Sequence, residues 1–170
     1  MNSDEVHIRP ARQSDSEEIY SMLKQLAAET GDGDRFCCTV DDIREFGFGR
    51  HTLFHCLIAS AQQQDLGLAL YFPLFSTTRG RPGVYLQDLW ISPGCRDWGV
   101  GLRMLREVIK AAGSQWQAGY LDLMVHGHNI GAERFYRRHG FIESAHDQHL
   151  TLKGEAFMRL VNNSEYSQGT

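Results

Sequence analysis

The chain has 170 residues, of which 42% are hydrophobic and 11% aromatic, enough for one domain with one sizeable core. Its formal net charge of -4, with no basic run longer than Arg137-Arg138, argues against nucleic acid or an anionic membrane as a partner and favours a cationic small molecule. The N-terminus carries no targeting pattern, no apolar segment approaches membrane-spanning length, and the four cysteines follow neither zinc nor disulfide spacing, so we expect a cytoplasmic protein with free thiols.

The first half of the chain predicts a strand, two helices and three further strands. A short strand over residues 6–10 precedes a capping box at Ser14-Asp15-Ser16-Glu17, which opens a helix that should stop near Gly31. Thr39 can cap a second helix that runs to about Gly47. Strand-like runs follow at residues 55–61, 66–75 and 84–91.

The second half predicts a helix, a strand, another helix and one or two closing strands. Apolar residues recur at helical spacing over 102–112, and a buried strand is expected over 120–125. Asn129 caps the next helix, and Gly140 ends it. Phe141 and the run Leu150-Thr151-Leu152 predict the closing strands. This order of elements indicates an α/β fold with a mixed sheet and a meander in its middle.

The run Arg96-Asp97-Trp98-Gly99-Val100-Gly101, between a predicted strand and a predicted helix, is the strongest candidate for a binding site. Its two glycines allow backbone N–H groups to face an anion, and the helix N-terminus adds the positive end of its dipole. Arg96 supplies a permanent cation. The pattern favours a pyrophosphate site, although close packing of the helix on the sheet would also explain the glycines.

Three segments together resemble the GNAT N-acetyltransferase superfamily: Ile8-Arg9-Pro10-Ala11, the Arg96-x-x-Gly99-x-Gly101 turn, and the run from Asn129 to Phe141. Residues 47–51, 55–59 and 85–89 further resemble its diamine (spermidine/spermine) acetyltransferase branch. The resemblance implies a mostly antiparallel, twisted sheet that splays to admit coenzyme A, flanked by helices. It also implies a homodimer. We expect one such domain over residues 1–161 and a polar tail over 162–170.

The resemblance implies acetyl-CoA as the acetyl donor, and we expect no metal. The pyrophosphate would accept N–H bonds from the glycine turn, and the pantetheine arm would pair with the preceding strand, where a backbone N–H near Leu89 would hold the oxyanion. Tyr136 matches the position that faces the thioester sulfur, where its hydroxyl could protonate the departing thiolate; an ordinary core tyrosine is the alternative. The donor contacts implied are Leu89, Trp90, Ile91, Arg96, Asp97, Trp98, Gly99, Val100, Gly101, Leu102, Asn129, Gly131 and Tyr136.

Gln87 and Asp88 are the candidates for handling the proton of the acceptor amine. In the diamine branch the residue matching Gln87 is usually a glutamate that draws the proton through ordered water. A glutamine amide cannot act as a base, so Gln87 could hold the water or the amine while the proton leaves through solvent or through Asp88. Successive strand side chains point to opposite faces, so both can face the acceptor only if a β-bulge intervenes.

Glu29, Asp32 and Asp34 lie in the segment where the superfamily places acceptor-recognition residues. Their carboxylates would attract a second ammonium group on the acceptor, or they are simply solvated loop acids. His126-Gly127-His128 lacks a third metal ligand at useful spacing, so we expect these histidines to line the strand end near the acceptor. Cys95, beside the turn, is interpreted as a packing residue.

The resulting hypothesis is an acetyl-CoA-dependent N-acetyltransferase that moves an acetyl group directly to a primary amine. The acceptor would be a small molecule such as a polyamine, a diamine or a lysine analogue. Two alternatives stay open: a transferase acting on a protein N-terminus or lysine, and a non-catalytic acetyl-CoA-binding module, which the amide at Gln87 would suit.

Overall fold

The computed structural model describes residues 6–62, 64–144 and 149–161, and the chain separates into two compact units. The first unit ends at Ile130 and the second begins at Gly131. The predicted single domain over residues 1–161 spans both units and stays a prediction. The predicted polar tail lies outside the described residues.

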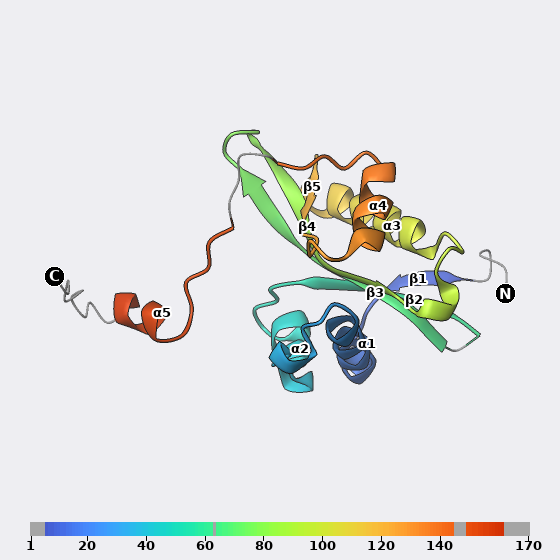
Figure 1. The fold of residues 1–170 in the computed structure, drawn as a ribbon, viewed down its shortest axis with the longest axis horizontal. Helices are drawn as coiled ribbons and strands as arrows, with labels where there is room; N and C mark the ends of the chain where they lie inside the picture. The colour runs from blue at the N-terminus through green and yellow to red at the C-terminus, as the bar shows by residue number, and fades with distance from the viewer. Residues whose placement is uncertain (1–5, 63, 145–148, 162–170) are drawn as a thin grey trace. The chain divides into compact units, whose positions relative to one another are not determined.

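A five-stranded sheet forms the centre of the first unit (Figure 1). Neighbouring strands follow chain order, the first four are antiparallel, and the last is parallel to the fourth. This topology confirms the mixed α/β sheet with a central meander. The strands are β1 (His7–Pro10), β2 (His55–Ala61), β3 (Gln64–Ser76), β4 (Arg81–Ile91) and β5 (Leu121–Leu123).

β4 and β5 stay together over only a short distance. β5 pairs with residues 84–86 of β4, whereas β4 continues to Ile91 and remains paired with β3 on its other side. Beyond Leu86, the edge of β4 that faced β5 therefore has no strand neighbour among the described residues. Its backbone N–H and C=O groups on that side lack a strand partner, as the predicted splay requires, and one of the carbonyl oxygens in this stretch, that of Ile91, accepts from Nε of Arg96.

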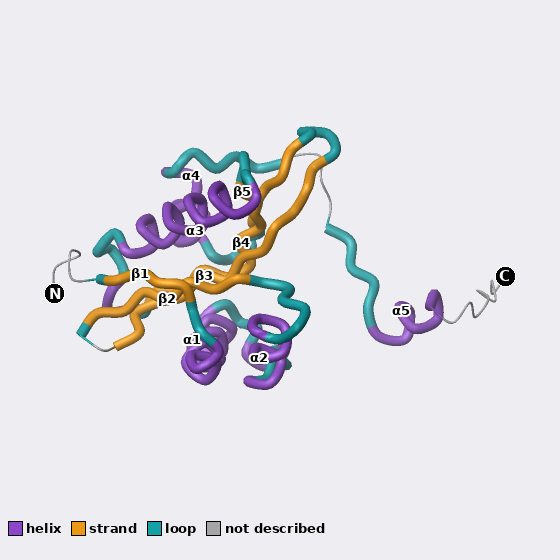
Figure 2. Tube along the Cα trace, turned by 180° about the vertical axis from the view of Figure 1, so that it is seen from behind, coloured by secondary structure: helices purple, strands orange, loops and turns teal. Residues whose placement is uncertain are grey.

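Three α-helices cover the sheet on its two faces (Figures 1 and 2). α1 (Ser16–Glu29) and α2 (Val40–Phe48) lie on one face and α3 (Val100–Trp116) on the other. Short 3-10 turns join them at η2 (Gln13–Asp15), η3 (Gly33–Arg35) and η4 (Pro93–Cys95). The core beneath α1 and α2 buries apolar side chains from both helices and the sheet: Ile19, Met22, Leu23, Ile43, Cys56, Ile58, Leu68, Leu70 and Trp90. No helix within the described ranges combines the length and apolar character needed to cross a bilayer.

The N-terminus of α1 differs from the prediction. Asp15, not Ser14, makes the local contacts: its carboxylate accepts from the N–H of Arg12 at 2.6 Å and from the Arg9 guanidinium at 2.7 and 3.0 Å. The predicted capping box at residues 14–17 is therefore wrong. A bidentate, charge-assisted contact to Arg9 is stronger than a neutral serine cap, so the first turn is built around Asp15.

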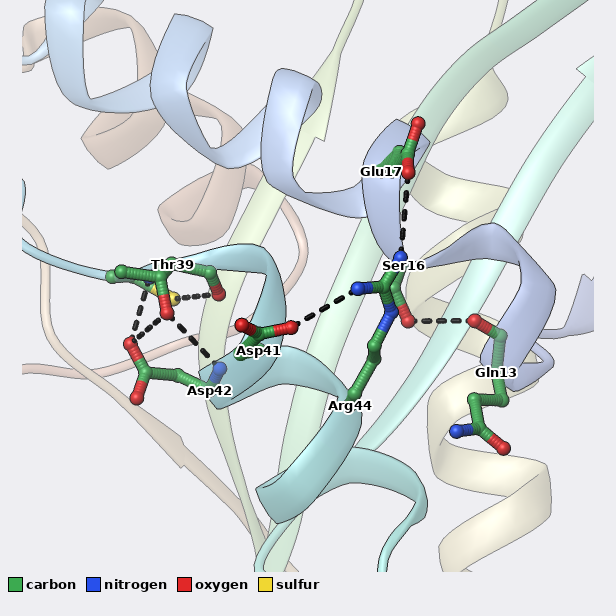
Figure 3. A network of polar contacts seen from close by, with 8 residues as sticks. Gln13, Ser16, Glu17, Thr39, Asp41, Asp42 and Arg44 are labelled. Carbon is green, nitrogen blue, oxygen red and sulfur yellow. Dashed lines mark hydrogen bonds and ion pairs between the residues drawn. The ribbon is translucent and has the colours of Figure 1, made fainter.

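The predicted cap of α2 is confirmed. The N–H of Asp42 donates to Oγ1 of Thr39 at 3.1 Å, and the N–H of Thr39 donates to the Asp42 carboxylate at 2.8 Å (Figure 3). Arg44 then contacts Asp41 at 3.0 Å and Glu17 at 3.3 Å, which ties the start of α2 to the start of α1. These contacts fix the two helices that lead into and out of the predicted acceptor loop.

The second unit contains most of α4 (Ile130–Arg138) and all of α5 (Gly154–Val161). Gly140 has φ 87°, so it ends α4 as predicted. The prediction of closing strands is wrong for the described residues, because Phe141 and the run Leu150-Thr151-Leu152 form no strand. Three alternating residues are too few to specify a strand without a paired neighbour, and Leu150 is 87% exposed.

Candidate functional site

The glycine turn reverses the chain between β4 and α3. Asp97 and Gly99 both adopt left-handed backbone conformations, with φ of 68° and 76°. Such a conformation is strained for a residue other than glycine, so the surrounding structure imposes it at Asp97. A Cβ atom on Gly99 would meet nothing within 4 Å. Open space beside Gly99, at the N-terminus of a 17-residue helix whose first N–H groups lack intrahelical partners, is an arrangement suited to an anion.

Two side chains beside this turn are buried. Val100 is 1% exposed and Cys95 is 8% exposed, and both belong to the buried hydrophobic set. The contribution of Val100 to an anion site is thus confined to its backbone. The burial of Cys95 agrees with its interpretation as a packing residue.

Arg96 lies at the turn, but its guanidinium already has partners. Its Nε donates to the carbonyl oxygen of Ile91 at 2.9 Å, and its Nη2 forms an ion pair with Oε2 of Glu29. The side chain is 47% exposed. The predicted cation is therefore present at the turn, held between the end of β4 and the end of α1.

Glu29 is placed beside the donor-side residues. In addition to its ion pair with Arg96, its Oε1 accepts a hydrogen bond from the indole Nε1 of Trp90 at 3.1 Å. Trp90 is 4% exposed and lies in β4, next to the predicted pantetheine-binding edge. The sequence predicts an acceptor role for Glu29 and carries no signal for these contacts.

The connection from α1 to α2 is also held to the segment that follows β5. Nε2 of His126 lies 3.2 Å from the Asp32 carboxylate, which also contacts Arg35 at 3.1 Å. Nε2 of His128 lies 2.9 Å from the carbonyl oxygen of Thr30, and the two imidazoles stack with centroids 5.5 Å apart. Across the described residues, no group of three or more His, Cys, Asp or Glu side chains is placed to bind a metal ion.

A β-bulge lies at Gln87. Leu70 of β3 pairs with Asp88, but the next residue, Tyr71, pairs with Leu86, so Gln87 has no partner in β3. The bulge resets the alternation of side chains, and Asp88 consequently shares the face of Leu70, which packs in the core beneath α1 and α2. Gln87 is exposed and Asp88 is half-buried. The bulge that both side chains need in order to face one acceptor is thus present.

Asp88 has the properties of a proton acceptor. Burial raises the pKa of its carboxyl from 3.8 to about 6. Within the described part of the chain, no cation offsets the effect of burial on this pKa. Its charge also contributes, after burial, to the raised pKa of Cys38 and of Cys56. A carboxyl group that titrates near neutral pH is a common feature of functional sites.

Tyr136 lies in α4, in the second unit. It is half-buried, and its ring makes edge contacts with Phe135 and Phe141, both at 5.2 Å between centroids. Asn129 precedes α4 as predicted, and its backbone N–H donates to the carbonyl oxygen of His126 at 2.8 Å. The acid role of Tyr136 stays a prediction.

Comparisons with known proteins identify the family of this chain. The model of the acetyltransferase (GNAT) family matches residues 19–141. The thialysine N-epsilon-acetyltransferase of Mus musculus is 30% identical, over 91% of this chain and 96% of its own length. The spermidine/spermine N(1)-acetyltransferase-like protein 1 of Homo sapiens is 27% identical, over 85% of this chain and 22% of its own length.

One solved structure extends the comparison to the fold. An aminoglycoside N-acetyltransferase in complex with CoA superimposes with a TM-score of 0.67 at 17% identity, covering 88% of this chain and 94% of that one. At this identity the likeness concerns the fold alone. The family match spans more than half of the chain, including β4 and the glycine turn. The chain belongs to the GNAT acetyltransferase family.

Proposed function

We propose that this protein is an acetyl-CoA-dependent N-acetyltransferase whose acceptor is a primary amine on a small molecule. The observation that carries the proposal is the unpaired edge of β4 leading directly into an open, glycine-containing turn at the N-terminus of α3. An extended arm that ends in a pyrophosphate fits such a site. The CoA bound by a structural neighbour and the names of the two relatives support the donor and the amine acceptor.

The donor would be held mainly by backbone groups. N–H groups at the start of α3 would donate to the pyrophosphate oxygens, and residues 89–91 of β4 would pair with the pantetheine arm. A backbone N–H near Leu89 would stabilise the oxyanion that forms when the amine attacks the thioester. In that reaction the new C–N bond forms, the C–S bond breaks, and the amine loses a proton. Tyr136 would supply a proton to the departing thiolate.

Asp88 would accept the proton of the acceptor amine, directly or through water. Its carboxyl pKa of about 6 means that it is mostly ionised at neutral pH, yet is a better base than an ordinary aspartate. Gln87 cannot accept the proton, but its exposed amide at the bulge can hold the amine or a water molecule. This assignment explains how the chain could work without the glutamate found in the diamine branch.

A small acceptor is favoured over a peptide. The connection after α1 is joined to the segment after β5 through Asp32 with His126 and through Thr30 with His128. A peptide needs an open groove, whereas these contacts tie together two segments that would border the acceptor. Asp32 is already paired, so Asp34, which has no side-chain partner among the described residues, is the freer carboxylate for a second ammonium group.

The test is release of CoA when the protein is mixed with acetyl-CoA and a panel of lysine analogues, diamines and polyamines. We expect release above background with at least one of them. Tight acetyl-CoA binding without turnover on any amine would instead support a non-catalytic module, and recovery of activity in Gln87→Glu would then identify a decayed enzyme. Tyr136→Phe should lower turnover more than acetyl-CoA affinity; an equal loss in both would identify a structural tyrosine.

The resemblance to the diamine branch also leads us to propose a cytoplasmic homodimer. Light scattering coupled to size-exclusion chromatography should give twice the mass of the chain. A monomer at every concentration tested would contradict this.

A further inference from the structure

We propose that Glu29 is a positioning residue for the donor site: it joins the pyrophosphate turn to β4 by holding Arg96 and Trp90 with one carboxylate. This inference rests on the proposed function, because it assigns a role within the acetyl-CoA site. It assigns Glu29 to the donor site instead of the acceptor site. Glu29 would not touch the reacting atoms, so its effect would be indirect.

The contacts form a closed loop of three side chains. Oε1 of Glu29 accepts from the Trp90 indole at 3.1 Å, and Oε2 pairs with Nη2 of Arg96. The guanidinium returns to β4 through its Nε, which donates to the carbonyl oxygen of Ile91 at 2.9 Å. One carboxylate on α1 thereby connects the two segments that would bind the two ends of the donor, the β4 edge and the turn.

The position of Glu29 in its own helix is unfavourable. It is the last residue of α1, where the negative end of the helix dipole disfavours a carboxylate. Its partners are 61 and 67 residues away in the chain. Helix preference therefore does not explain a glutamate at this position, whereas its two distant tertiary contacts do.

The turn that Glu29 supports needs such support. Asp97, directly after Arg96, holds a left-handed conformation with φ 68°, and the anion-binding N–H groups begin only a few residues later. When Arg96 is fixed at both Nε and Nη2, fewer backbone conformations of the turn remain accessible. A turn that is already ordered loses less entropy when it binds the pyrophosphate, so the donor binds more tightly.

The pair is not explained by simple charge attraction. Arg96 is 47% and Glu29 36% exposed, so solvent screens much of the Coulomb energy. A purely electrostatic view also predicts the opposite result: removal of a negative charge near a pyrophosphate would strengthen donor binding. The sign of the effect on CoA affinity therefore separates positioning from electrostatics.

The experiment measures the dissociation constant of CoA by calorimetry for the wild type, Glu29→Ala and Glu29→Gln. We expect Glu29→Ala to weaken CoA binding on the order of tenfold. Glu29→Gln should recover part of the loss, because its amide oxygen can still accept from Trp90 or Arg96. The KM of the acceptor should stay within about twofold of the wild-type value, since no acceptor contact is removed.

Asp15→Asn is the matched control. It removes the charge from another ion pair, Arg9 with Asp15 at 2.7 Å, which lies in β1 and η2 outside the donor-binding segments. It should lower the thermal midpoint of unfolding without changing the CoA dissociation constant. This control separates positioning from a general loss of stability.

Three results would overturn the inference. The first is a CoA affinity that is unchanged or tighter in Glu29→Ala. The second is a rise in the acceptor KM while CoA binding stays the same, which would assign Glu29 to the acceptor site. The third is a loss of CoA affinity in Asp15→Asn as large as the loss in Glu29→Ala. A wild-type protein that binds no CoA would refute the proposed function itself, and this inference with it.

Discussion

Replacing Asp88 with asparagine should make the folded protein more stable at neutral pH. Burial raises the pKa of this carboxyl from 3.8 to about 6, so the folded protein holds the charged form less favourably than the unfolded chain does. Each pKa unit corresponds to about 1.4 kcal/mol, so a shift of about two units corresponds to about 3 kcal/mol of free energy of unfolding. Asparagine has nearly the same shape and removes the charge.

The pH dependence gives the sign of this effect. The group binds its proton more tightly when folded, so the wild type loses stability as pH rises from about 4 to about 6, and the penalty is complete above that range. The stability difference between Asp88→Asn and wild type should therefore grow from near zero at about pH 4 to about 3 kcal/mol above pH 7.

Urea unfolding of both proteins, followed by circular dichroism at several pH values, measures this difference. Other titrating groups are common to both chains and cancel. A difference that does not change with pH, or a variant that is less stable than the wild type at neutral pH, would refute the reasoning. The second result would mean that the ionised carboxylate has stabilising partners.

The same substitution should impair catalysis. General base catalysis is typically worth 10²–10⁴-fold, so kcat/KM should fall by about that amount in Asp88→Asn. The wild type should gain activity as pH rises through the pKa of about 6, and the variant should lack this dependence. A variant with wild-type kcat/KM and an unchanged pH profile would exclude Asp88 as the proton acceptor.

Two further predictions concern the scaffold. Gly67→Ala would place a Cβ 2.5 Å from the carbonyl oxygen of Trp90, so it should displace β4, cost about 1–3 kcal/mol of stability and weaken CoA binding. The control is Gly113→Ala, within α3, where an added Cβ would meet nothing within 4 Å. It should stabilise the protein by about 0.5–1 kcal/mol and leave CoA affinity unchanged. Similar behaviour of the two variants in calorimetry and thermal unfolding would contradict both expectations. Thr39→Ala should cost about 1 kcal/mol, because it removes the cap of α2, and an unchanged urea midpoint would show that the cap contributes nothing.

The features that could be predicted from the sequence depend on neighbouring residues. Thr39 caps α2 through Asp42, only three residues away, and Gly31 and Gly140 follow helix ends with positive φ. The central strands are predictable because their apolar runs are long. The order of elements around the glycine turn, and hence the candidate donor site, was recognisable for the same reason.

The features that could not be predicted depend on distant partners. The bulge at Gln87 depends on how β4 pairs with β3, whose register shifts between Leu70 and Tyr71. The contacts of Glu29 join residues more than 60 positions apart. At the start of α1, the ion pair of Arg9 with Asp15 takes the place of the predicted serine cap. In each case a tertiary contact determined the outcome.

The most direct test of the central claim is detection of the acetylated product. Protein, acetyl-CoA and each candidate amine are incubated together, and the amine is analysed by mass spectrometry. We predict that at least one small primary amine gains a single acetyl group at a rate that requires the protein and falls sharply in Asp88→Asn. Binding of acetyl-CoA without acetylation of any amine, in the wild type as in the variant, would contradict this account.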